Sequence, residues 1–335
     1  MAAVDHRATR IPPNFFGIAL GLSGLAALWL DASDQFGAPA AVSDGLALIA
    51  AGVWVLVAAT YVRQGPRQIV ADTRDPAVGP FLAAAPISGF LLSETLAVHA
   101  EVAGRVVVIV FLVVGLLLGG WLTGQWMTGG LVEETFGPAF FLPGLGIGFV
   151  GSDAAATVGL HSIAEMYFGI GAVAWVLMSS VVFNRMFFRP RLAPPLLPTM
   201  AIELAPPAVA SSAYFALHPS PDPVALGLGG YAAFMVVAQL RLLPLYRKLS
   251  FTPGFWSFSF PCAAVATIGL DWLSIESPAG KSIYAWILIA AVSALIAAIA
   301  ARTLLALTRG ELLPAAATRP DAVAREGRPA LRGAA

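Results

Sequence analysis

The chain has 335 residues, of which 58% are hydrophobic and only 11% are charged. Soluble domains carry about 25% charged residues, so this composition excludes an ordinary soluble protein and predicts a surface that faces lipid. Basic and acidic residues balance at 19 each, so the charge gives no reason to expect a nucleic-acid partner. The single cysteine, Cys262, excludes an internal disulfide and a thiolate metal site.

Ten apolar segments are each long enough to cross a bilayer as a helix, which takes about 20 residues. In chain order they are 14–31, 44–63, 77–98, 102–124, 139–159, 163–184, 196–217, 223–243, 254–273 and 283–308. The first resembles the apolar part of a signal peptide, but nine more follow it, so we interpret it as an uncleaved span. The predicted fold is an all-α polytopic membrane protein with a transmembrane domain at 14–309.

The flanking and connecting residues predict the orientation in the membrane. Residues 1–13 are polar, and residues 310–335 are rich in Ala, Pro and Arg and are predicted to be a disordered tail. If the N-terminus is inside, only Arg105 and Lys281 of the 19 basic residues lie outside. The outside segments carry acidic residues instead, namely Asp31, Asp34, Asp222 and Glu276. This positive-inside bias predicts that both termini lie in the cytoplasm, at the cell membrane.

Prolines divide the ten segments into two classes. Those inside or near the odd segments are Pro80, Pro86, Pro143, Pro198, Pro206, Pro207 and Pro261, whereas the even segments have none inside, with Pro223 and Pro244 at the ends of the eighth. Proline kinks a helix and frees a carbonyl, which must then be satisfied by protein or water. We therefore predict five helical hairpins, each with a kinked inner helix and a straight outer helix, arranged around one axis.

Glycines spaced four residues apart predict close helix packing. The pairs are Gly17 and Gly21, Gly115 and Gly119, and Gly120 and Gly124. The segment Gly146-Ile-Gly-Phe-Val-Gly151 matches the dinucleotide fingerprint formally, but no strand precedes it, so we interpret its glycines as packing residues in a span.

Four segments resemble a known family. They are FFGIALGLSGLAALW from Phe15, LAPPAVASSAY from Leu204, FWSFSFP from Phe255 and LTRGEL from Leu307. In this order, and with this number of spans, they resemble the TehA tellurite-resistance and dicarboxylate-transporter family, which includes the slow anion channels of plant guard cells. The resemblance covers about residues 10–312.

The resemblance implies five hairpins around a central pore, odd helices inside, and a homotrimer of separately conducting protomers. It also implies a pore blocked midway by a phenylalanine that precedes a proline on the ninth helix, which here is Phe260 before Pro261. From the residues alone, Phe260 would be an ordinary packing aromatic. Phe258 is two positions away, about 200° round a helix, and cannot share that face.

Glu203 lies inside the seventh segment, where an ionisable group is a functional hypothesis by default. The alternative is a hydrogen-bonded carboxyl that fills the space beside a proline kink. Burial disfavours the charged form, so we predict that Glu203 is protonated in the conducting state. Glu203→Gln should then preserve the flux and flatten its pH dependence.

Other charged residues near the spans receive less specific interpretations. Glu94 is expected at the outer mouth, Asp153 at a break or vestibule in the fifth helix, and Asp271 at the outer interface. Arg105 is expected to reach the outer interface with its long side chain.

No lysine or arginine lies in the middle of a segment, so a pore would lack fixed cations. Backbone groups and hydroxyls of kinked helices would bind anions weakly instead, which suits conduction. The candidate pore residues are Gly17, Ser23, Ser88, Ser211 and Ser212, with kinks at Pro86, Pro143, Pro206, Pro207 and Pro261. The four histidines show no metal-ligand spacing and no catalytic triad or phosphate loop occurs, so neither a cofactor nor an enzyme activity is expected.

Two classes of function remain open. The first is a channel for small inorganic anions, gated by Phe260. The second is a proton-coupled carrier of malate-like dicarboxylates, or an exporter of sulfite or tellurite. A membrane enzyme is a weaker third reading.

Overall fold

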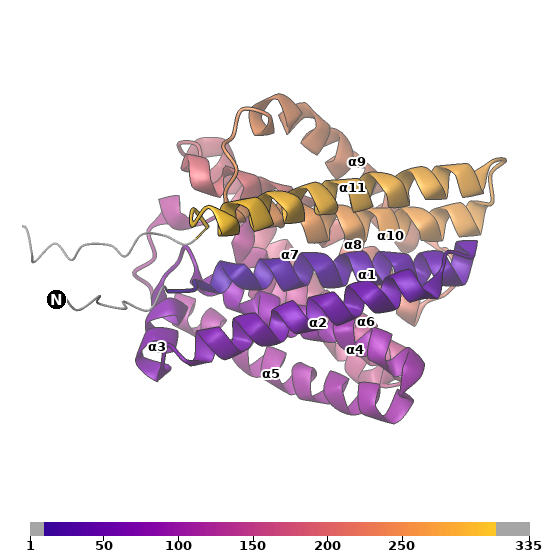
Figure 1. The fold of residues 1–335 in the computed structure, drawn as a ribbon, viewed down its shortest axis with the longest axis horizontal. Helices are drawn as coiled ribbons and strands as arrows, with labels where there is room; N and C mark the ends of the chain where they lie inside the picture. The colour runs from indigo at the N-terminus through magenta and orange to yellow at the C-terminus, as the bar shows by residue number, and fades with distance from the viewer. Residues whose placement is uncertain (1–9, 313–335) are drawn as a thin grey trace, which may run out of the picture.

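The computed structural model describes residues 10–312, and within them every regular element is a helix (Figure 1). Ten helical spans are long and apolar enough to cross a membrane, which confirms the number of predicted segments. The predictions for residues 1–9 and 313–335, including most of the tail, lie outside the described residues.

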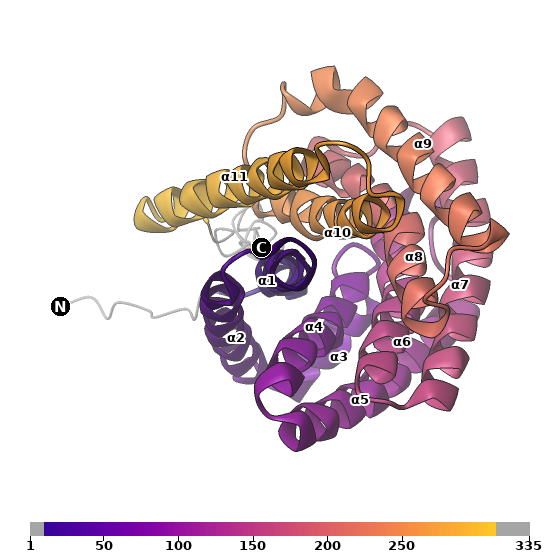
Figure 2. The same cartoon turned by 90° about the vertical axis from the view of Figure 1, so that its right-hand side faces the viewer.

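The even spans are single, uninterrupted α-helices. They are α2 (Ala40–Val62), α5 (Glu101–Met127), α7 (His161–Phe188), α9 (Pro223–Tyr246) and α11 (Lys281–Thr308). Between 17 and 28% of the residues in their most apolar windows are buried. They form the outer layer of the bundle (Figure 2).

The odd spans are composite. Each begins with a 3₁₀ or π segment and continues as an α-helix: η1 (Pro13–Phe15) and α1 (Phe16–Phe36), η2 (Gly79–Ala83) and α4 (Ala84–His99), η4 (Pro138–Phe140), η5 (Leu142–Gly146) and α6 (Ile147–Thr157), η6 (Pro194–Leu204) and α8 (Ala205–Leu217), and η7 (Pro253–Phe258) and α10 (Ser259–Glu276). Between 44 and 83% of their window residues are buried. The predicted inner and outer layers are thus confirmed, with α1, α4, α6, α8 and α10 in the inner ring (Figure 2).

The prolines of the inner spans act differently from the predicted mid-helix kinks. Pro86, Pro206, Pro207 and Pro261 stand in the first turn of α4, α8 and α10, directly after a 3₁₀ segment. The first turn of a helix has no partner for its N–H groups, so proline is tolerated there. Pro143 lies in the π segment η5, and Pro198 inside the long 3₁₀ segment η6. The prolines therefore mark joints between helix types near one end of the bundle.

Two smaller predictions need correction. The eighth span continues to Tyr246, so Pro244 lies inside the last turn of α9 rather than beyond it. Gly120 and Gly124 contact no neighbouring helix, because a Cβ at either position would meet nothing within 4 Å. At Gly21 and Gly119 a Cβ would instead collide with Ser259 and with the Pro143 carbonyl, so these glycines do allow close helix packing.

Candidate functional site

Two cavities lie inside the inner ring. The proximal cavity, at the end where the described chain begins and ends, has a volume of about 360 Å³ and includes Pro12 and Leu312 in its lining. The distal cavity, toward the other end, has a volume of about 270 Å³ and includes Asp34. All five inner spans contribute to each lining, and no residue of the outer spans does.

Phe260 stands between the two cavities and is the one described residue common to both linings. Its side chain is almost fully buried, at 8% exposure. The ring faces Gly24 of α1, where an added Cβ would lie 2.8 Å from the ring Cδ2. The glycine therefore leaves the space that the ring occupies.

Phe258 occupies a different environment, as the helical rotation predicts. Its ring centroid lies 4.8 Å from that of Tyr246 on α9, and 5.7 Å from that of Phe255. It lines neither cavity. The hydroxyl of Ser259, between the two phenylalanines, is buried and donates to the Trp256 carbonyl at 2.5 Å. This contact fixes the start of α10, from which Phe260 projects.

The proximal cavity is largely apolar and contains no basic residue in its lining. Its one carboxylate is Glu311, which is exposed. Asn14 and Thr252 each present a buried side-chain oxygen that has no hydrogen-bond partner among the described residues. The Thr252 hydroxyl can donate to an anion, whereas Asn14 can do so only through its amide N–H groups, because its unpartnered Oδ1 is an acceptor. Neither residue is predicted from the sequence, although Asn14 begins the first predicted segment and Thr252 lies two residues before the ninth.

The distal cavity is acidic. Asp31 and Asp34 of α1, Glu94 of α4 and Asp153 of α6 all contribute to its lining, and no basic residue does. Glu94 has a buried Oε1 without a hydrogen-bond partner in the described part of the chain. Asp271 lies close by, paired with Gln35 through a hydrogen bond of 2.7 Å. Ionised carboxylates in this space repel an anion.

The places predicted from the sequence for Glu94 and Asp153 agree only partly with the structure. Glu94 does lie at a mouth, but it shares that mouth with carboxylates from two other helices. Asp153 lies inside the continuous helix α6, and the irregular part of the fifth span is η5, about two to three turns earlier. The predicted vestibule therefore exists at Asp153, whereas the predicted break does not.

Comparison with known proteins now identifies the family. The family model described as SLAC1, voltage-dependent anion channel, matches residues 10–304. The chain belongs to this family. It is 28% identical to the tellurite resistance protein TehA homolog of Haemophilus influenzae over 282 residues, which span 83% of this chain and 86% of that protein.

Two plant members of the SLAC1 family match shorter stretches. The S-type anion channel SLAH2 of Arabidopsis thaliana is 26% identical over 129 residues, 37% of this chain and 24% of that protein. The guard cell S-type anion channel SLAC1 of the same plant is 25% identical over 122 residues, 36% of this chain and 22% of that protein. The protein is thus a multi-pass membrane protein of a family of anion channels and transporters, and not an enzyme.

Glu203, the ionisable residue predicted to act inside the seventh span of this SLAC1-family chain, lies away from both cavities. Glu203 is 3% exposed, and its Oε1 has no hydrogen-bond partner among the described residues. It lines neither cavity. The segment η6, which carries Glu203, packs against α9 of the outer layer.

Three predicted hydroxyl donors also lie behind the cavity walls. Ser23, Ser88 and Ser211 are buried, and their hydroxyls donate to the carbonyls of Leu20, Ala84 and Pro207 in their own helices. None of them lines a cavity. Of the predicted pore residues, Gly17 lines the proximal cavity and Ser212 the distal cavity.

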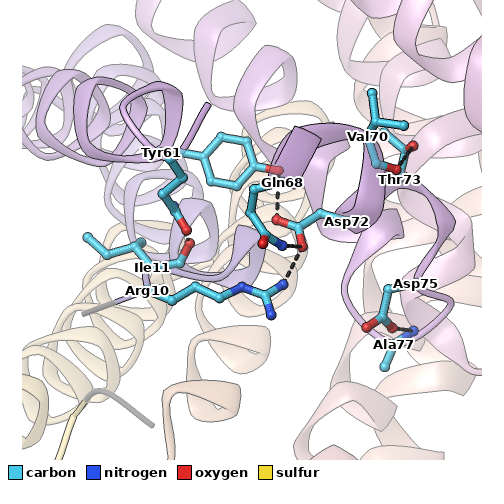
Figure 3. Close-up of polar contacts among 10 residues, drawn as sticks. Arg10, Ile11, Tyr61, Gln68, Val70, Asp72, Thr73, Asp75 and Ala77 are labelled. Atoms are coloured by element: carbon cyan, nitrogen blue, oxygen red, sulfur yellow. Dashed lines mark hydrogen bonds and ion pairs between the residues drawn. The ribbon is translucent and has the colours of Figure 1, made fainter. Parts of the chain in front are cut away.

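A polar cluster fastens the start of the chain beside the proximal cavity (Figure 3). Its centre is Asp72 of the short helix α3 (Pro66–Arg74), whose side chain is 1% exposed. Asp72 forms an ion pair with Arg10 and accepts hydrogen bonds from Tyr61 at 3.0 Å and from Gln68 at 2.8 Å. Ala77, soon after α3, belongs to the cavity lining, so this cluster holds part of the proximal mouth in place.

Proposed function

We propose that this protein conducts small anions through a central pore along its five inner spans, and that the ring of Phe260 is the gate. The position of Phe260 between the two cavities carries the proposal. Rotation of this one ring out of the space beside Gly24 would join the cavities without moving a helix.

The proximal cavity supports weak, non-specific anion binding. It offers the neutral donors of Asn14 and Thr252 and no fixed cation. Conduction needs binding that is weak enough for the ion to leave. Such a pore is passive and favours anions that lose their hydration water easily.

The distal cavity favours a second candidate function, a proton-coupled carrier of malate-like dicarboxylates or an exporter of sulfite or tellurite. Asp31, Asp34, Glu94 and Asp153 face one another there, with Asp271 of α10 beside them and no basic residue in the lining. Neighbouring carboxylates without a cation are places where protons bind, so an anion and a proton can meet on one path.

The orientation and assembly belong to the same proposal. We place both termini on the cytoplasmic side of a cell membrane, because among the basic residues that the structure describes only Arg105 and Lys281 lie near the other end, close to the starts of α5 and α11. The resemblance to the TehA family suggests a homotrimer whose protomers conduct separately, which chemical cross-linking in membranes would test.

The deciding experiment compares wild type, Phe260→Ala and Phe258→Ala in planar bilayers with chloride, nitrate, sulfite and malate. We expect Phe260→Ala to raise the anion current at least about tenfold, the factor that follows when a barrier falls by ~1.4 kcal/mol. Phe258→Ala removes the same ring from a residue outside both cavities, so it should conduct like wild type.

Equal currents from both variants would refute the gate. If no variant conducts but liposomes take up malate when a proton gradient is applied, the carrier function replaces the channel.

A further inference from the structure

A third cavity lies on the outside of the bundle, between α7, η6 and α9. We call it the arginine pocket; its volume is about 480 Å³. Three arginines line it: Arg185 near the end of α7, Arg191 in the connection to η6, and Arg241 near the end of α9. The rest of the lining is apolar and consists of Met186, Leu192, Leu197, Met200, Leu242 and Leu245.

Arg185 is incompletely satisfied for so buried a cation. Its exposure is 4%, and one Nη donates to the Glu134 carbonyl at 3.1 Å. Its Nε has no hydrogen-bond partner among the described residues. Buried donors without partners are rare and destabilising, so a guanidinium left in this state points to an anionic ligand.

The nearby acids leave the pocket positive. Glu133 is already engaged by Arg189, whose hydrogen bond holds the pKa of the Glu133 carboxyl below its usual range, with a smaller contribution from Arg185. Glu203, one turn deeper along η6, does not line the pocket. Arg191 and Arg241 are exposed, and neither has an ion pair or side-chain hydrogen bond with a described residue. No carboxylate among the lining residues offsets the three charges.

The surroundings of the pocket face the membrane. α7 and α9 belong to the outer layer (Figure 2), and Phe187, Phe188, Val237 and Leu240 on these helices are 60 to 78% exposed. The pocket lies at the ends of both helices, on the side of the bundle where most arginines occur. A ligand there meets guanidinium groups on one side and lipid-facing apolar surface on the other.

We propose that the arginine pocket binds the phosphate headgroup of an anionic phospholipid from the leaflet nearest the termini. Guanidinium groups match phosphate oxygens in charge and geometry. Basic pockets between membrane helices are known headgroup sites. The acyl chains lie along the exposed apolar faces of α7 and α9, and one headgroup oxygen satisfies Arg185.

The test uses the full-length protein, purified in a neutral detergent and stripped of lipid. Phosphatidylglycerol or phosphatidylcholine is titrated, and bound lipid is counted by native mass spectrometry. The variant Arg191→Gln/Arg241→Gln changes only exposed side chains and so preserves folding. The control Arg67→Gln/Arg247→Gln removes two exposed arginines from the same end of the bundle, outside the pocket.

We expect wild type and the control to retain one phosphatidylglycerol, and the pocket variant to bind it about thirtyfold more weakly, as the loss of two arginines near a membrane surface predicts. If the control binds phosphatidylglycerol as weakly as the pocket variant does, the proposal is overturned, because the lipid would then be attracted by the general surface charge. Equal retention of phosphatidylcholine would overturn it as well. Inorganic phosphate that displaces the bound lipid at micromolar concentration would identify a site for a soluble anion instead.

Discussion

The proximal and distal cavities are built from the same five inner spans, yet they differ sharply in charge. The proximal cavity has unpaired neutral groups on Asn14 and Thr252 and one exposed carboxylate in its lining. The distal cavity has four carboxylates. An anion thus meets a neutral, weakly binding space on one side of Phe260 and a repulsive one on the other.

This difference follows from where each cavity sits along the spans. The proximal cavity is built at the joints between 3₁₀ or π segments and α-helices, where irregular backbone brings polar groups to a lining that is otherwise apolar. The distal cavity is lined by the regular α-helical parts of the same spans, and it carries the acidic side chains. The two cavities therefore differ both in the part of the spans that lines them and in the charge of that lining.

The largest change in conductance is expected when the neutral proximal cavity is made acidic like the distal one. Asn14→Asp, measured in the Phe260→Ala background, should lower chloride conductance about thirtyfold at neutral pH. Two unit charges about 8 Å apart interact with ~2 kcal/mol at an effective dielectric constant of 20. Single-channel recording checks this prediction.

Asn14→Ala is the matched control, because it removes the amide without adding charge. It should stay within about threefold of the Phe260→Ala background, the range for the loss of one neutral hydrogen bond. Equal losses in both variants would mean that the Asn14 amide, rather than the neutrality of the cavity, governs conduction.

Neutralising the distal cavity should have the opposite and smaller effect. Glu94→Gln/Asp153→Asn in the same background should raise conductance roughly fivefold, which corresponds to ~1 kcal/mol of screened repulsion. The parent should conduct better as the pH falls, because protons neutralise the carboxylates, and the variant should show a weaker dependence, since only Asp31 and Asp34 remain in the lining. Current measured from pH 8 to pH 4 tests both expectations.

Glu203→Gln provides the contrast for that experiment. Glu203 lines neither cavity, so Glu203→Gln should preserve the anion flux, as the sequence also predicts. The pH dependence decides between the two sites: flattening by Glu203→Gln alone would place the proton-sensitive group outside the distal cavity.

Much of the fold was predictable, because hydropathy and proline placement are local signals. The ten spans and the inner position of the odd ones follow from segments of about 20 apolar residues and from the exclusion of unsatisfied backbone from lipid. The side-chain directions were less predictable. Glu203 was assigned on the assumption of an α-helix, but it stands in the 3₁₀ segment η6, which turns every 3.0 residues.

The distal cavity was missed for a different reason. Asp31, Glu94 and Asp153 lie on three helices far apart in the sequence, and their meeting is a property of tertiary packing. The serine donors were misplaced because a helical serine usually has a carbonyl of its own helix within reach, as Ser88 and Ser211 do. Phe260 was assigned by family resemblance, since a lone aromatic in a span carries no positional signal.

The role of the Phe260 ring as the barrier between the cavities can be tested without removing the ring. A Cβ at Gly24 would lie 2.8 Å from the Phe260 ring, so Gly24→Ala must displace it. We expect a two- to threefold rise in basal anion current over wild type, a change of about 0.5 kcal/mol in the gating equilibrium. Gly17→Ala, on the same helix, meets only the Trp256 Cβ at 3.7 Å and should leave the current unchanged.

The smallest effect on conduction is expected at the outer rim of the proximal cavity, where the Asp72 cluster fastens the chain. Asp72→Asn removes the charge that pairs with Arg10 while keeping the side-chain volume. Loss of a buried hydrogen bond to a charged group destabilises the folded protein by about 1–3 kcal/mol. The unfolding temperature in detergent should therefore fall by several degrees. Conductance of the Phe260→Ala background should stay the same, because Asp72 lies outside both cavity linings. If the current changes while the unfolding temperature does not, the cluster controls the proximal mouth directly, and the path for anions begins at α3 rather than at the inner spans.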